Sequence, residues 1–63
     1  MIEFFGMKVT EREIVDLADA AVTGLGRCQV MLEFAQNVED RVFAIAAYDA
    51  FLKIAKECFR VLP

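Results

Sequence analysis

The chain has 63 residues, 59% of them apolar, and its ten acidic and seven basic side chains give a net charge of −3. It contains no His and no Ser, which excludes His-based acid–base catalysis, a Ser nucleophile and a His-containing metal site. We therefore expect no enzyme activity, no cofactor and no metal. The acidic balance also argues against nucleic-acid binding, because contacts with phosphate dominate that affinity.

The proportion of apolar residues is high for so short a chain. A domain of about 60 residues buries only about 60% of the surface that its unfolded chain exposes. We therefore expect apolar side chains left over from the core to be covered by a second copy or by a partner. A membrane is not expected, because the longest uncharged runs, 20–26 and 42–48, are seven residues long, whereas a spanning helix needs about 20. The N-terminus lacks the basic region of a secretory signal, so we expect a cytoplasmic protein.

Residues 1–9 form an apolar N-terminal arm. Ile2, Phe4, Phe5 and Met7 are large apolar residues, and the segment has no convincing strand pattern. The arm either covers the open end of a helical bundle or docks onto another subunit or a target, with Gly6 as the hinge. Phe4 and Phe5 are therefore candidate partner-binding residues.

A first helix is predicted over about 10–35. Thr10 and Glu13 have the spacing of a capping box, in which each side chain bonds the other's backbone N–H. Apolar residues then recur in alternating steps of four and three, as in the buried seam between packed helices. The seam residues of this helix are Ile14, Ala18, Ala21, Leu25, Cys28 and Leu32.

Gly24 and Gly26 conflict with this helix. Two interior glycines cost about 2 kcal/mol relative to alanine, so they could divide the segment and give a three-helix domain. The seam passes through Leu25 and Cys28 without a change of phase, which favours one continuous helix. Glycine would then permit the close approach of a neighbouring backbone.

A second helix is predicted over about 38–61, after a break at Gln36 and Asn37. Asn37 either ends the first helix or caps the second, with Asp40 in the first turn. The seam residues of this helix are Ala44, Tyr48, Phe51, Ala55, Cys58 and Leu62. The fold class is therefore all-α, a single antiparallel helical-hairpin domain over 1–63.

The second helix is apolar over an arc of about 220° on a helical wheel. A surface helix needs an apolar stripe only a little wider than about 100°, so half of this arc requires a second contact. Self-association supplies that contact most simply. The sequence therefore predicts a homodimer in which two hairpins form a four-helix bundle.

The outer side of the first helix carries Val30 and Phe34, away from the seam. Either the dimer covers them, or they form an exposed apolar patch for a different protein. Arg27 lies one turn before Val30 and adds a charged edge of the kind found around binding hot spots. Arg27, Val30 and Phe34 are therefore the helical candidates for partner binding.

Charge is divided unequally along the chain. Residues 1–40 carry eight acids and three bases, whereas 41–63 carry two acids and four bases. In an antiparallel hairpin the acidic start of the first helix lies beside the basic end of the second, which suits both helix dipoles and predicts a few weak ion pairs. The alternative is that the acidic first turns attract a basic partner.

Cys28 and Cys58 lie on seam positions, far apart along the hairpin, and cannot form a disulfide within the chain. We expect both to be buried thiols that act as small apolar side chains. Tyr48 is another seam residue, and we expect its ring to pack in the core.

These observations favour a small non-enzymatic regulatory protein that homodimerises and binds, and inhibits, a larger protein. An alternative is a structural subunit or chaperone of a larger assembly. A third possibility is an RNA-binding dimer, because the length, the hairpin and the alternation of small and large seam residues resemble the Rop family of plasmid copy-number regulators. That resemblance concerns architecture, no motif is shared, and the first helix shows only Arg12 and Arg27 among several acids.

Overall fold

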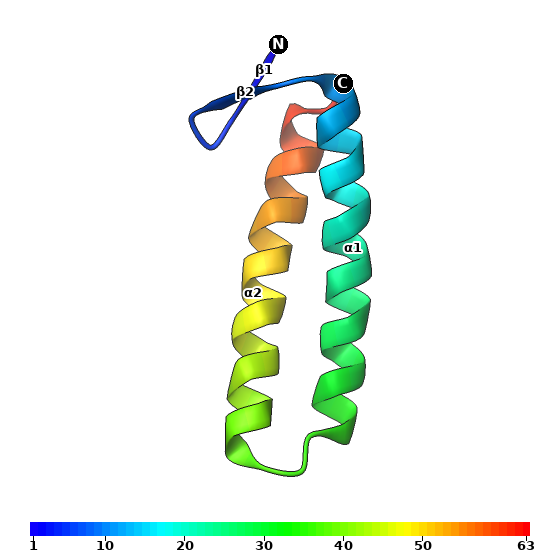
Figure 1. Cartoon of the computed structure of the whole chain (residues 1–63), viewed down its shortest axis with the longest axis vertical. Helices are drawn as coiled ribbons and strands as arrows, with labels where there is room; N and C mark the ends of the chain where they lie inside the picture. The colour runs from blue at the N-terminus through cyan, green and yellow to red at the C-terminus, as the bar shows by residue number, and fades with distance from the viewer.

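The computed structural model describes all 63 residues as a helical hairpin with a small sheet at its open end (Figure 1). The elements in chain order are β1 (Ile2–Phe4), β2 (Met7–Val9), α1 (Glu11–Phe34) and α2 (Val38–Val61). The helices run antiparallel and side by side along a molecule that extends over 43 × 18 × 14 Å. The predicted two-helix hairpin is confirmed, with both helices within a residue or so of their expected bounds.

Side chains at the two helix starts explain where the helices begin. The Thr10 hydroxyl accepts from the Glu13 N–H at 3.1 Å, and the Thr10 N–H donates to the Glu13 carboxylate at 2.8 Å. Asn37 caps α2, because its side-chain oxygen accepts from the Asp40 N–H at 2.8 Å. Each cap satisfies backbone donors that have no partner inside the helix. Asn37 therefore starts the second helix and does not end the first in a left-handed conformation.

Helix α1 runs without interruption through both glycines. Gly24 is buried, and a Cβ added to it would lie 2.7 Å from the ring of Phe51 on α2. A Cβ on Gly26 would meet nothing within 4 Å. The close approach expected at the glycines therefore occurs at Gly24 alone, and the group that approaches is an aromatic side chain, where a backbone was expected.

The N-terminal arm is a two-stranded antiparallel hairpin, so the fold has a small β element beside its helices. Ile2 pairs with Val9 and Phe4 with Met7. The two residues of its turn, Phe5 and Gly6, both have positive φ, 49° and 79°, as a type I′ turn requires. Strands of three residues are too short to show a clear alternating pattern, which is why sequence periodicity did not reveal them.

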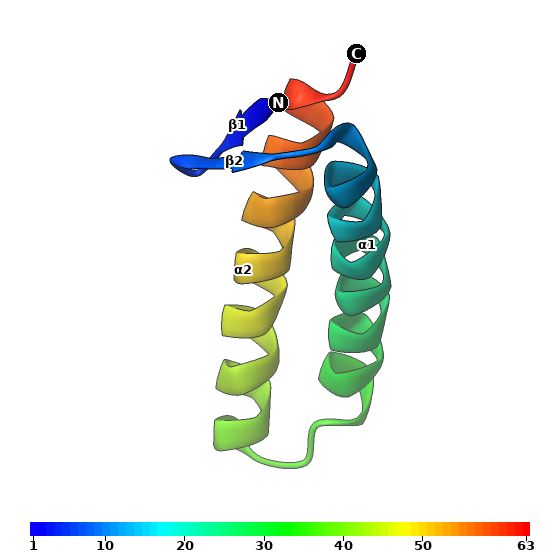
Figure 2. The same ribbon diagram turned by 45° about the horizontal axis from the view of Figure 1, so that its top comes forward.

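The β-hairpin folds over the open end of the helices (Figure 2). Phe4 is only 3% exposed and forms the core there with Ile14, Ala18 and Cys58. Partly buried apolar side chains of both helices pack against this core, namely Leu17, Ile54, Val61 and Leu62. Of the two roles proposed for the arm, the structure shows the first, a cover for the open end of the hairpin.

The two helices pack along the predicted seam. None of the twelve seam residues is exposed: seven are buried, and Leu25, Leu32, Tyr48, Phe51 and Leu62 are half-buried. Small residues make up most of the fully buried seam, including Ala21, Ala44 and Ala55, which allows the helices to lie close together.

The ion pairs all lie within single helices. Arg12 pairs with Asp16, Lys53 with Asp49 and Arg60 with Glu57, at spacings of three or four residues. The ion pairs expected between the acidic start of the first helix and the basic end of the second are therefore not formed. These side chains point to solvent from the outer edges of the hairpin, because apolar residues occupy the space between the helices.

Candidate functional site

More large apolar side chains are exposed than buried in this molecule. Ile14 and Phe4 are the only large residues among the buried ones. The exposed set is Met1, Phe5, Met7, Val15, Val22, Val30, Met31, Phe34, Val38, Val42, Phe43, Ile45 and Phe59. Contiguous exposed apolar surface on a small domain marks an interaction site, so the arrangement of these side chains is the functional question.

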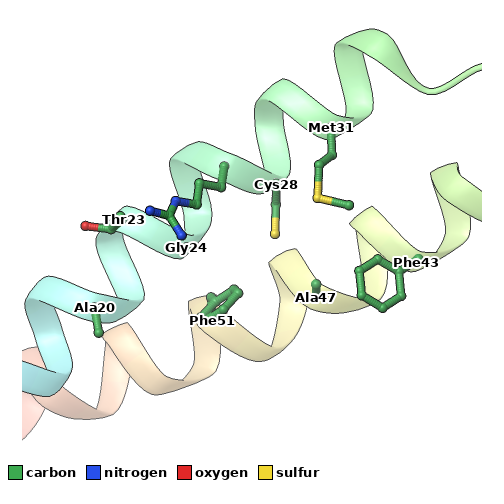
Figure 3. Close-up of a pocket in the computed structure, with 9 residues that line it drawn as sticks. Ala20, Thr23, Gly24, Cys28, Met31, Phe43, Ala47 and Phe51 are labelled. Carbon is green, nitrogen blue, oxygen red and sulfur yellow. The ribbon is translucent and has the colours of Figure 1, made fainter.

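A groove runs between the two helices in the half of the hairpin nearer the turn. It has a volume of about 530 Å³. Figure 3 shows side chains of both helices around it, and the residues that line it are Ala20, Thr23, Gly24, Arg27, Cys28, Met31, Phe43, Ala47 and Phe51. Small side chains on the seam leave this space open, while Met31 and Phe43 stand at its margin.

Arg27 is the one charged residue that lines the groove. It takes part in none of the ion pairs of the structure. Arg27 and Met31 also line a second, shallower depression on the outer side of α1, where Val22, Gly26 and Val30 lie. The groove and this depression therefore meet at a shared rim with an available positive charge.

The structure separates the residues predicted to bind a partner. Arg27 and Val30 line the same depression on α1, and Phe34, one turn further on, is 74% exposed without lining either hollow. Phe5 is 60% exposed at the tip of the β-hairpin, at the opposite end of the molecule. Phe4 is a core residue, which corrects its assignment to a partner-binding surface. The ring reaches the core because β1 lies against α2.

Sequence reasoning missed Met31 and Phe43 as candidate site residues. Phe43 lies inside the apolar arc of the second helix, and the sequence accounts for that arc by dimerisation alone. Met31 lies one step from the seam residue Leu32. The signal that could have found both is their position on the same flank of the seam, next to the small residues Gly24 and Ala47.

A second apolar surface lies on the other side of the seam. Residues seven apart in a helix point in nearly the same direction. Val15 and Val22 are so related on α1, as are Ile45, Leu52 and Phe59 on α2, and Val22 also borders the depression on the outer side of α1. We call these five residues the heptad face. Four of the five are about half exposed, from 48% for Val15 to 62% for Phe59, and Leu52 is half-buried.

The titratable groups with altered pKa values are structural. The backbone N–H and hydroxyl of Thr10 lower the pKa of Glu13, and the Arg60 guanidinium lowers the pKa of Glu57. Burial, reinforced by the charge of Glu57, raises the pKa of the Cys58 thiol. A raised pKa disfavours the reactive thiolate. Cys28 and Cys58 are both free and buried, as expected for seam residues.

Comparisons with protein-family models, with curated proteins and with solved structures find no match for this chain. Neither helix offers a stretch long and apolar enough to cross a lipid bilayer. No three acidic or cysteine side chains come together in a way that could hold a metal ion. The two apolar surfaces, the groove and the heptad face, are therefore the features on which a functional proposal rests.

Proposed function

We propose that this chain is a small non-enzymatic regulatory protein that homodimerises and binds, and inhibits, a larger protein. The observation that carries the proposal is the exposure of large apolar side chains on two separate faces of one hairpin. Leaving a phenylalanine or valine in water forgoes roughly 1.5–3 kcal/mol of burial. Two such faces suit two partners, one of which is a second copy.

The heptad face is suited to self-association. Its side chains recur every seven residues on both helices, which is the spacing that lets helices interdigitate in a four-helix bundle. Two hairpins joined through this face would leave each groove on the outside of the bundle. The groove and its rim are therefore the surface that we propose for the larger partner.

The groove suits an apolar side chain with a nearby negative charge. Met31 and Phe43 flank the space that such a side chain would enter, and Arg27 at the rim would pair with the acidic group. A buried apolar anchor with a charged neighbour is the usual centre of a protein interface. Inhibition follows if the anchor belongs to a surface that the larger protein needs for its own activity.

The test is a pull-down from the native host with the purified wild-type protein as bait, followed by mass spectrometry and by a binding isotherm for each captured protein. Three baits accompany it, Phe43→Ala, Phe34→Ala and Val42→Ala. Val42 is exposed on α2 but lines neither hollow, so its variant is the matched control.

We expect the Phe43→Ala bait to remain a dimer and to lose at least tenfold in affinity for the partner, while Val42→Ala binds as the wild type does. Phe34→Ala reports whether the contact extends past the rim. If Phe34→Ala dissociates the dimer, Phe34 belongs to the self-association surface. Equal binding by the Phe43→Ala and Val42→Ala baits would contradict the assignment of the groove.

A further inference from the structure

We infer that the second copy packs on the heptad face in one particular order, with α1 of each copy beside α2 of the other and both helical turns at the same end of the bundle. This inference rests on the self-association proposed above and goes further by naming the contact surface and the symmetry. The two-fold axis then runs parallel to the helices.

The contact between Gly24 and Phe51 sets which residues of the two helices lie at the same height. Because the helices are antiparallel, Val22 lies nearly level with Leu52, and Val15 with Phe59. Seven residues further towards the turn, Gln29 on α1 lies level with Ile45 on α2. The heptad face is therefore a ladder of paired residues across the hairpin, broken by one polar residue near the turn.

Two flat hairpins can stack on such a face in two symmetric ways. With the two-fold axis parallel to the helices, α1 lies on α2 of the second copy, residues keep their height, and both turns come to one end. With the axis across the helices, α1 lies on α1 of the second copy and α2 on α2, and the turns come to opposite ends. All neighbouring helices are antiparallel in both cases, so helix direction does not distinguish them.

The charges beside the heptad face do distinguish them. On α1 this side of the helix carries three acids, Glu11, Asp19 and Glu33, and one base, Arg12, which pairs with Asp16. The corresponding side of α2 carries three bases, Arg41, Lys56 and Arg60, and one acid, Asp49, which pairs with Lys53. Asp19, Glu33, Arg41 and Lys56 form no ion pair within the chain, so they are available to a second copy.

With the axis parallel to the helices, Asp19 and Glu33 each meet a base of the second copy at about their own height. Arg12 and Arg60 also come nearly level, but each is paired with an acid of its own helix. Glu33 comes to Arg41 and Asp19 comes to Lys56. With the axis across the helices, Glu11 comes near Glu33 of the other copy, and Arg41 near Arg60. Like charges across an interface disfavour a pairing, and opposite charges fix its register. The parallel axis is therefore the order that the charges select.

The size of the face and the position of the β-hairpin agree with this order. A stable interface covers about 800 Å² of each partner, and the molecule that presents the heptad face on one side extends over 43 × 18 × 14 Å. Phe4 of the β-hairpin belongs to a core whose partly buried neighbours include Leu17, Ile54 and Val61, which lie on the groove side of the seam. The β-hairpin therefore does not obstruct the heptad face.

Spin labels at the turn measure the order directly. A nitroxide attached to Gln36→Cys under native conditions reacts with the exposed new thiol, since Cys28 and Cys58 are buried. A second protein labelled at Asp49→Cys, near the middle of α2, is the matched control, because a label there gives a short distance between copies in either order. Sedimentation gives the mass of each labelled protein, and double electron–electron resonance gives the distance.

We expect a dimer with about 20 Å between the two labels at position 36, a distance of two helix diameters. A dimer in which these labels lie about as far apart as the 43 Å length of the molecule, while the labels at position 49 stay close, would overturn the helix order and leave the proposed function intact. A monomer of 7.1 kDa would instead overturn the self-association itself.

Discussion

The ring of Phe51 occupies the space beside Gly24 that a side chain on that residue would need. A Cβ at this position would lie 2.7–2.8 Å from three atoms of the ring, closer than such atoms approach in proteins. The contact joins the middle of α1 to the middle of α2 and forms one wall of the groove. The glycine is therefore required by packing, although it weakens the helix locally.

The two glycines of α1 should respond differently to alanine. Gly26→Ala places its Cβ in open space and should raise the free energy of unfolding by about 1 kcal/mol, the difference in helix propensity. Gly24→Ala should lose that gain, because overpacking costs about 1–3 kcal/mol. Urea unfolding measures both variants. A Gly24→Ala/Phe51→Leu double variant should recover part of the loss, and equal stabilisation by both alanines would contradict the contact.

The β-hairpin should contribute to stability through Phe4 more than through Phe5. Phe4 is buried against Ile14 and Cys58, so Phe4→Ala should lower the free energy of unfolding by about 3 kcal/mol. Phe5 is exposed and contacts the Phe4 ring edge-on, with ring centroids 4.7 Å apart. Phe5→Ala should cost about 1 kcal/mol. Thermal unfolding compares the two, and similar losses would show that the β-hairpin does not close the core.

Cys58 should make the protein less stable at alkaline pH. Burial raises the pKa of its thiol, so above pH ~8.5 the unfolded chain releases a proton that the folded chain keeps. The free energy of unfolding therefore falls as pH rises through the interval between the unfolded and folded pKa values, and is unaffected below it. Cys58→Ala should reduce this fall, although it costs roughly 1 kcal/mol in packing at neutral pH.

The control for this prediction is Cys28→Ala, in which Cys58 is retained. Unfolding curves at pH 7 and at pH 10 give the change in stability for each protein. The Cys28→Ala variant retains Cys58 and should therefore still lose stability between pH 7 and pH 10. If Cys58→Ala and the wild type lose the same stability between these pH values, the raised pKa of the Cys58 thiol is not the cause of the alkaline loss.

The helical part of the fold could be predicted from particular residues. Thr10, Glu13 and Asn37 mark the two helix starts by local hydrogen bonding, and alternating steps of four and three place the seam. Such signals are contained in a few neighbouring residues. The β-hairpin could not be predicted in this way, because its strands are three residues long and Phe5 adopts a positive φ that is uncommon for an aromatic residue.

The candidate site was only partly predictable for a different reason. Val30 and Phe34 are exposed because they point away from the seam, which a helical wheel shows. The position of the groove depends on the side of the seam on which each flanking residue lies. Its width depends on the space that the small residues Gly24 and Ala47 leave between the helices. That requires the relative height and rotation of the two helices, which one helix considered alone does not contain. For the same reason, the sequence alone suggests a partner surface for Phe4, although this residue belongs to the core.

The central claim is that a second copy covers part of the exposed apolar surface. Sedimentation equilibrium of the wild-type protein at micromolar concentration, with circular dichroism to establish helicity, tests it most directly. We expect a helical species of about twice 7.1 kDa, and a shift toward the monomer in Val22→Glu, which places a charge in the middle of the heptad face, but not in the control Val42→Glu. A wild-type chain that is fully helical and sediments at 7.1 kDa would contradict the claim.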